Sequence, residues 1–226
     1  MRCGTAAILI LGIVLAGCAT NRGVIDLRVS KAAKSSTAVP VKFVAINDRR
    51  VFQLAPKKPS IPSLRNGEIN DRKITSRAIA RKRNTYGQAL GDILLPEGRT
   101  VEQLTREALT KALNESGYEV LSKDDPGYET ARPLTVEIDQ FWAWVTPGFW
   151  EIAMEFEAKV RLVGDWPVAV GRRRVRGYAR VTGMAGTTEM WTKVMNNGLA
   201  KFIEAVKTVL RRTSALQNFP GAKPVS

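Results

Sequence analysis

The stretch WEIAMEFEAKVRLV, residues 150–163, alternates between apolar and mostly charged side chains. Every even-numbered residue from Trp150 to Leu162 is apolar, whereas most odd-numbered ones are glutamate, lysine or arginine. Because successive side chains of a strand point to opposite faces, the pattern predicts a strand with one face in the core and the other in water. Half-buried strands of this kind are typical of antiparallel sheets.

The segment before this strand has the same period, with apolar residues at positions 134, 136, 138, 142 and 144. A turn at 146–149 would join the two strands into a hairpin. A two-residue loop, however, would place the two apolar sets on opposite faces of the sheet. We therefore expect an odd-length loop or a β-bulge, with the even-numbered tryptophans Trp142, Trp144 and Trp150 in the core.

A third strand is predicted over residues 174–181, where arginines alternate with small or β-branched residues. If the chain turns within residues 164–167, Glu157 lies opposite Arg174 and Glu155 lies opposite Arg176. Opposite charges at such positions stabilise a sheet modestly, so we interpret the arginines as cross-strand partners. An anion-binding strip is the alternative.

Two helices complete the predicted core. Thr100 and Gln103 form a capping-box pattern before an apolar period of helical spacing, and Gly117 is placed to end that helix. A second amphipathic helix begins at Thr188. The predicted fold is α+β: an antiparallel sheet of about four to five strands with two helices packed on one face, in a single domain over residues 41–213. A flexible tail is expected at 214–226.

The first part of that domain reads as a strand at 41–46 followed by a long basic loop over residues 50–98, where prolines at 56, 59 and 62 oppose regular structure. Within the loop, residues 65–83 are strongly basic. A solvated segment is one interpretation, and an anion-docking surface is the other. The candidate anion-binding residues are Arg72, Lys73, Arg77, Arg81, Lys82 and Arg83.

The residues Leu15-Ala16-Gly17-Cys18 follow an apolar run at 6–15 that is too short to span a bilayer. They resemble the lipobox of bacterial lipoproteins, in which the signal peptide is cleaved before the cysteine and the cysteine is acylated. The resemblance implies a signal peptide at 1–17, lipid at Cys18 and a tether at 18–40. Several acyl chains hold a protein stably at a membrane, palmitate being a typical one. Ala19, in place of aspartate, implies the outer membrane, with the domain facing the periplasm.

Further along, the chain resembles the uncharacterised YajG-like bacterial lipoproteins. The resemblance rests on the lipobox, on Asn47-Asp48-Arg49-Arg50 after the first strand, on the segment 83–87 and on Ser116-Gly117-Tyr118 at the end of a helix. It covers residues 15–125 and brings no catalytic residues with it.

Composition narrows the function further. The chain has no histidine, and of its two cysteines Cys3 would leave with the signal peptide and Cys18 would carry lipid. There is no phosphate-binding loop, nucleophile elbow or metal-ligand spacing, so we predict neither an enzyme nor a metal or cofactor site. The net charge of +14 favours polyanionic neighbours, which in the periplasm would be lipid or glycan and not nucleic acid.

Two functions fit these observations. The first is a binding or scaffold protein of envelope biogenesis or transport, which would dock an envelope protein through the hairpin tip. Phe141 and Phe149 are the candidate docking residues, because the alternation places both outside the core. The second is a binder of lipopolysaccharide, anionic lipid or peptidoglycan through the basic 65–83 segment.

Overall fold

Eight strands form one mixed sheet in the computed structural model, which describes residues 22–32, 38–65, 67–84, 86–164 and 172–217. The hydrogen-bonded order is β1-β4-β3-β6-β2-β5, with β7 pairing β6 and β8 pairing β7. The strands are β1 (Gly23–Val24), β2 (Val39–Asp48), β3 (Ala78–Arg83), β4 (Ala89–Leu94), β5 (Tyr118–Val120), β6 (Arg132–Pro147), β7 (Ile152–Val163) and β8 (Arg172–Gly183).

The long strand β6 organises the sheet. Antiparallel β7 follows one of its edges, and β8 continues this antiparallel pairing. The other edge is shared, because β2 pairs in parallel with the first half of β6 and β3 joins the second half through Ala80 and Ala143. Two further parallel pairs, β1 with β4 and β2 with β5, extend the sheet.

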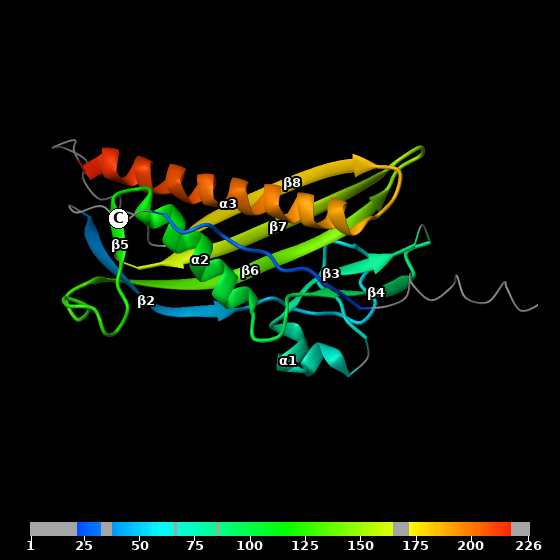
Figure 1. Cartoon of the computed structure of the whole chain (residues 1–226), viewed down its shortest axis with the longest axis horizontal. Helices are drawn as coiled ribbons and strands as arrows, with labels where there is room; N and C mark the ends of the chain where they lie inside the picture. Colours follow the sequence, from blue (N-terminus) through cyan, green and yellow to red (C-terminus); the bar gives the residue numbers. More distant parts are fainter. Residues whose placement is uncertain (1–21, 33–37, 66, 85, 165–171, 218–226) are drawn as a thin grey trace, which may run out of the picture.

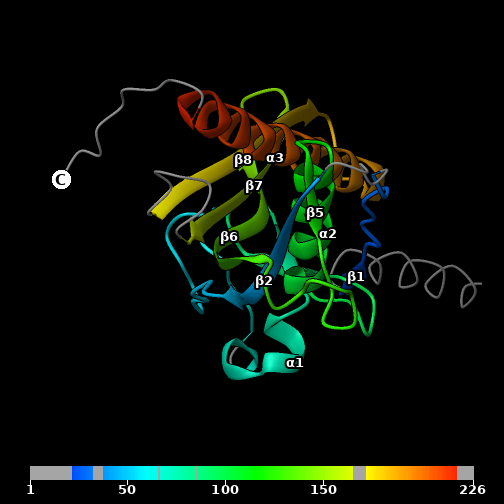
Figure 2. The same cartoon turned by 90° about the vertical axis from the view of Figure 1, so that its left-hand side faces the viewer.

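Within the residues that the structure describes, three helices accompany the sheet: α1 (Arg72–Thr75), α2 (Val101–Asn114) and α3 (Thr188–Gln217), besides one 3₁₀ turn, η1 (Glu68–Asn70). The long helices α2 and α3 lie over one face of the sheet, and α1 lies on the other side of the molecule (Figures 1 and 2). The main hydrophobic core fills the space between the sheet and these two helices. The capping box of Thr100 and Gln103 is confirmed.

The predicted antiparallel sheet of four to five strands with two helices is therefore wrong. The antiparallel run β6-β7-β8 is present, but four of the seven strand pairs are parallel. The period-two pattern of residues 134–181 reports how those strands alternate between core and solvent. It carries no information about which distant strands pair along the free edge of β6, and parallel partners join through long connections.

A β-bulge at Asp139 changes which residues of β6 face the core. Before it, the even-numbered residues such as Ile138 are buried, and after it the odd-numbered Phe141 and Ala143 enter the same core. Phe141 is 2% exposed and packs edge-on against Phe156, with ring centroids 5.0 Å apart. The placement of Phe141 on a docking surface is therefore wrong, because the bulge inverts the alternation on which that placement rested.

The tryptophans expected in one core are also separated. Trp142 and Trp144 are buried on the opposite face of β6, in a second cluster with Leu64 and Leu94. Trp150, in contrast, is 82% exposed in the loop between β6 and β7.

The register predicted between the second and third strands is wrong as well. Glu155 lies opposite Arg180, and Glu157 lies opposite Tyr178. The predicted register requires a turn within 164–167, whereas β8 begins only at residue 172. Glu157 still forms an ion pair with Arg176, as a diagonal neighbour, and Glu155 accepts a hydrogen bond from the Tyr178 hydroxyl at 2.5 Å.

The segment 50–98, expected as a loop, instead contributes η1, α1, β3 and β4 and covers the second cluster. The expected tether at 18–40 must also be shortened, because Ile25 and Leu27 are buried in the main core and β1 pairs with β4. At the other end of the chain, α3 extends to residue 217, and residues 218–226 of the predicted tail lie outside the described residues.

Helix α3 approaches the sheet most closely at two glycines. A β-carbon on Gly177 of β8 would lie 2.4–2.5 Å from Phe202, including its backbone, and one on Gly198 of α3 would lie 2.2 Å from the Phe156 ring. We expect Gly177→Ala to destabilise the fold by about 1–3 kcal/mol, because backbone atoms cannot rotate away from the added methyl group. Gly23→Ala, which meets only ordinary contacts at 3.7 Å or more, is the control. Urea unfolding measures both, and equal stability of the two variants would contradict the close packing.

Candidate functional site

A cavity of about 580 Å³ opens at one end of the molecule. Its lining comes from β1, from the β3–β4 region and from the ends of β6 and β7 that flank the turn between them. The residues that lead from β8 into α3 complete it. These segments gather at the right-hand end of Figure 1, opposite the end that carries β5. The volume lies in the range of roughly 300–1,000 Å³ that is usual for small-molecule sites.

The cavity has an apolar wall and a smaller polar portion. The apolar lining residues come from segments far apart in the sequence. They include Ile25, Leu90, Ile93, Val145, Ile152, Met184 and Trp191. The polar lining residues are Lys82, Arg83, Asn84, Thr187 and Thr188. Lys82 extends to β1, because its Nζ lies 3.7 Å from the position that a β-carbon on Gly23 would occupy. This combination suits an amphiphilic ligand, with an apolar part and a polar part.

Large apolar side chains project into solvent around the cavity mouth. Phe149 and Trp150 are 90% and 82% exposed, and their rings pack edge-on with centroids 4.8 Å apart. They form the tip of the β6–β7 hairpin, whose flanking residues Pro147 and Ile152 line the cavity. Met184, which is 85% exposed, also lines the cavity and follows Gly183, the residue of β8 that pairs with Ile152. We call Phe149, Trp150 and Met184 the apolar rim.

The six basic candidates of the 72–83 segment do not form one anion site. Arg81 is buried and forms an ion pair of 2.8 Å with Asp92, which is itself fully buried on β4. Arg72 pairs with Glu102 at 2.8 Å, and Arg77 donates through Nε to the Leu95 carbonyl at 3.0 Å. These three arginines are therefore occupied by carboxylate or carbonyl groups of the protein itself.

Arg83 and Lys82 differ, because both line the cavity. The Arg83 guanidinium donates to two uncharged acceptors, the Gly87 carbonyl at 2.7 Å and the Ser63 hydroxyl at 3.0 Å. Burial lowers the pKa of Arg83, and the charge of Arg81 lowers it further. An anionic group at this wall would offset that repulsion. Lys73 lies in α1 and does not line the cavity.

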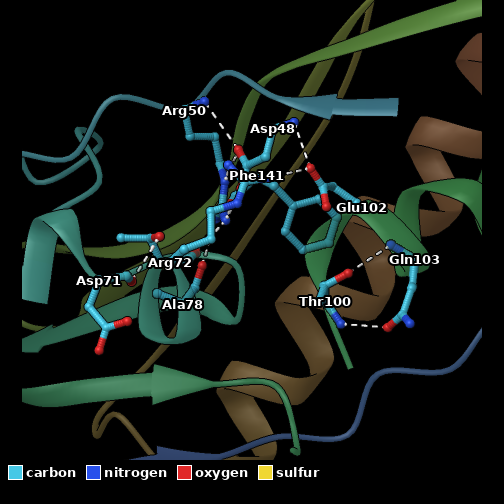
Figure 3. Close-up of polar contacts among 10 residues, drawn as sticks. Asp48, Arg50, Asp71, Arg72, Ala78, Thr100, Glu102, Gln103 and Phe141 are labelled. Carbon is cyan, nitrogen blue, oxygen red and sulfur yellow. Dashed lines mark hydrogen bonds and ion pairs between the residues drawn. The ribbon is translucent and has the colours of Figure 1, made fainter. Parts of the chain in front are cut away.

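Asp48 and Arg50 form a second polar cluster next to α1 (Figure 3). Arg50 donates through Nε and Nη2 to the Asp48 carboxylate, at 2.9 and 2.7 Å. Its other donors reach the carbonyls of Thr75 at 2.7 Å, Ala78 at 2.5 Å and Phe141 at 3.1 Å. All five guanidinium N–H groups are thus used, which leaves none for a ligand and makes this cluster a structural clamp.

The described residues contain no group of three or more histidine, cysteine, aspartate or glutamate side chains that could hold a metal ion. Among the helices in the described part of the chain, none is both long and apolar enough to cross a membrane.

Sequence reasoning identified part of this site. Lys82 and Arg83, predicted as anion-binding residues, line the cavity, whereas Phe149, predicted as a docking residue, lies outside the lining in the hairpin tip between Pro147 and Ile152. The cavity itself was missed, because its walls come from five segments that only the fold brings together. Cys18, the predicted lipid attachment site, lies outside the described residues.

No family model and no curated protein matches the sequence. Solved structures similar to this chain include an uncharacterized protein with 11% identity, which covers 85% of this chain and 98% of its own at a TM-score of 0.43. A DUF330 protein from Xanthomonas campestris has 12% identity, 87% and 98% coverage and a TM-score of 0.38. A proposed lipoprotein from Caulobacter crescentus CB15 has 18% identity, 57% and 90% coverage and a TM-score of 0.30.

Proposed function

We propose that this protein is a non-enzymatic, lipid-anchored component of the cell envelope that binds an amphiphilic ligand in the cavity at the end of its sheet. The lipid would be carried by Cys18, and the domain would face the periplasm from the outer membrane. The observation that carries the binding function is the cavity itself, which combines a usual ligand volume with a lining of mixed apolar and polar surface, the apolar share being the larger.

The lining specifies the class of ligand. Leu90, Ile152 and Met184 line the cavity without being fully buried and offer surface for an alkyl chain or another extended apolar group. Lys82 and Arg83 also line the cavity and favour an anionic group on the ligand. A fatty acid or the acyl portion of an anionic lipid has both features. An apolar segment of a protein partner would use the apolar wall alone.

A fluorescent polyene fatty acid provides a direct test. We expect it to bind the purified full chain, and Leu90→Trp to weaken binding at least about tenfold, because the indole fills the cavity. Leu54→Trp, at an exposed leucine outside the lining, is the matched control and should bind as the wild type does. Lys82→Glu should weaken the fatty acid but not the corresponding alcohol. Equal binding by the two tryptophan variants would reject the cavity as the binding site.

The anchor is tested separately. We expect Cys18→Ser to abolish incorporation of labelled palmitate and to leave the protein unprocessed or released from the outer membrane after a high-salt wash. The wash is needed because a net charge of +14 by itself promotes adsorption to anionic surfaces. Recovery of this variant in washed outer membranes at wild-type levels would contradict lipid anchoring at Cys18.

A further inference from the structure

The beginning of the described chain is fixed on the fold. Arg22 donates to Glu68 at 2.8 Å and to the buried Asp92 at 3.2 Å. The next residues, Gly23 and Val24, pair with β4, and Ile25 is buried. Residues 22–25 are therefore an integral part of the domain and cannot act as a linker that lets the domain swing.

Covalent geometry then limits how far a lipid on Cys18 could be from the domain. Four residues of fully extended chain span at most about 14 Å, so Cys18 lies within that distance of Arg22 whatever its conformation. Gly23 and Val24, the residues next to Arg22, line the cavity. A bilayer that holds Cys18 must consequently approach the end of the molecule that carries the cavity.

The side chains around this end are those that favour a membrane interface. Aromatic residues and methionine dominate the apolar rim, and tryptophan is enriched at the level of lipid headgroups. Tyr86 and Val24 are also exposed and border the same end, Tyr86 through the hydrogen bond from its backbone N–H to Asn84. In water, this group of large apolar side chains has no packing reason to be exposed.

We propose that the apolar rim inserts into the interfacial region of the bilayer to which the chain is anchored, so that the cavity mouth opens toward the lipid headgroups. This inference rests on the proposed lipid at Cys18. It deepens the proposed function, because a ligand could then pass between the bilayer and the cavity without crossing water.

The test uses the full lipidated protein in phosphatidylethanolamine–phosphatidylglycerol vesicles. A photo-crosslinking amino acid is placed at position 149 in one sample, at position 184 in a second and at position 44 in a third. Val44 is the control, since it is 61% exposed on β2 and absent from the cavity lining. We expect lipid adducts at 149 and 184 to exceed those at 44 by at least about tenfold, and Trp150→Ser to reduce the adducts at 149.

Lipid adducts confined to the rim positions would support the proposal. If the protein carries lipid at Cys18 but positions 149 and 184 give no more lipid adducts than position 44, the rim does not face the bilayer and the inference fails while the anchor stands. Protein adducts at 149 in native envelopes, without lipid adducts, would overturn it in favour of a protein partner. Absence of lipid on Cys18 would overturn the anchor and this inference together.

Discussion

Arg50→Ala is expected to lower the free energy of unfolding by about 3–5 kcal/mol. The side chain is buried, and it joins the end of β2 to α1, to the start of β3 and to β6 through five hydrogen bonds. Removing it leaves the Asp48 carboxylate, itself only 6% exposed, without its partner, and three backbone carbonyls lose their donor. Urea unfolding followed by tryptophan fluorescence measures the change, because Trp142 and Trp144 lie in the cluster that this segment covers.

The neighbouring arginine provides the matched control. Arg49 is mostly exposed, and its Nε lies 4.0 Å from Glu137, so Arg49→Ala should change stability by no more than about 1 kcal/mol. Arg50→Lys retains the charge but not the five-donor fork, and we expect a loss close to that of alanine. A stability change below about 1 kcal/mol for Arg50→Ala would show that segment 50–78 does not depend on the clamp.

Asp92→Ala is expected to have a loss of similar size, about 3–5 kcal/mol. Asp92 is fully buried between Arg81 and Arg22, and its removal leaves the Arg81 guanidinium buried beside Arg83 without a carboxylate. The variant should also free the first described residues from β4. Limited trypsin digestion is expected to cleave after Arg22 faster than in the wild type, even under conditions where the rest of the chain stays folded.

Glu68→Ala separates the contribution of the Arg22 ion pairs to stability from that of the buried Arg81–Asp92 pair. Glu68 is the other partner of Arg22, but it is partly exposed, so its removal should cost about 1 kcal/mol or less. If Glu68→Ala and Asp92→Ala were equally destabilised, the buried Arg81–Asp92 pair would not contribute as described. If trypsin cleaved after Arg22 equally fast in Asp92→Ala and wild type, Asp92 would not hold the beginning of the domain.

Local patterns in the sequence predicted the parts of the fold that depend on local physics. The cap of α2 and the start of α3 at Thr188 follow from short-range hydrogen bonding and apolar spacing. Strand β3, with the sequence AIARKR, could not be predicted in the same way, because its buried Arg81 is compensated by Asp92 on a different strand. Its charges therefore read as a solvated loop.

The candidate site was only partly predictable for a related reason. The exposure of Phe149 follows from its position in a turn, whereas the burial of Phe141 depends on a single extra residue, Asp139, in β6. The mismatch between the two apolar sets predicts an odd-length loop or a bulge but does not place it, because residues 141–144 are all apolar and fit either face of the strand. The cavity depends on the parallel pairing of β1 with β4, which joins Gly23 to Ile93 across a long stretch of chain.

The parallel edge of β6 also has a consequence for how the chain reaches its native state. Val41 pairs with Arg132, and Ala80 pairs with Ala143, so β6 acquires its neighbours on that edge only after large loops have closed. Loop closure costs entropy before the contacts repay it, and topologies of this kind fold slowly. The antiparallel meander of β6, β7 and β8 needs no such closure and can form early, with one edge of β6 still unpaired. An unpaired edge templates aggregation, so the newly synthesised chain is expected to need a holding chaperone until β2 and β3 have docked.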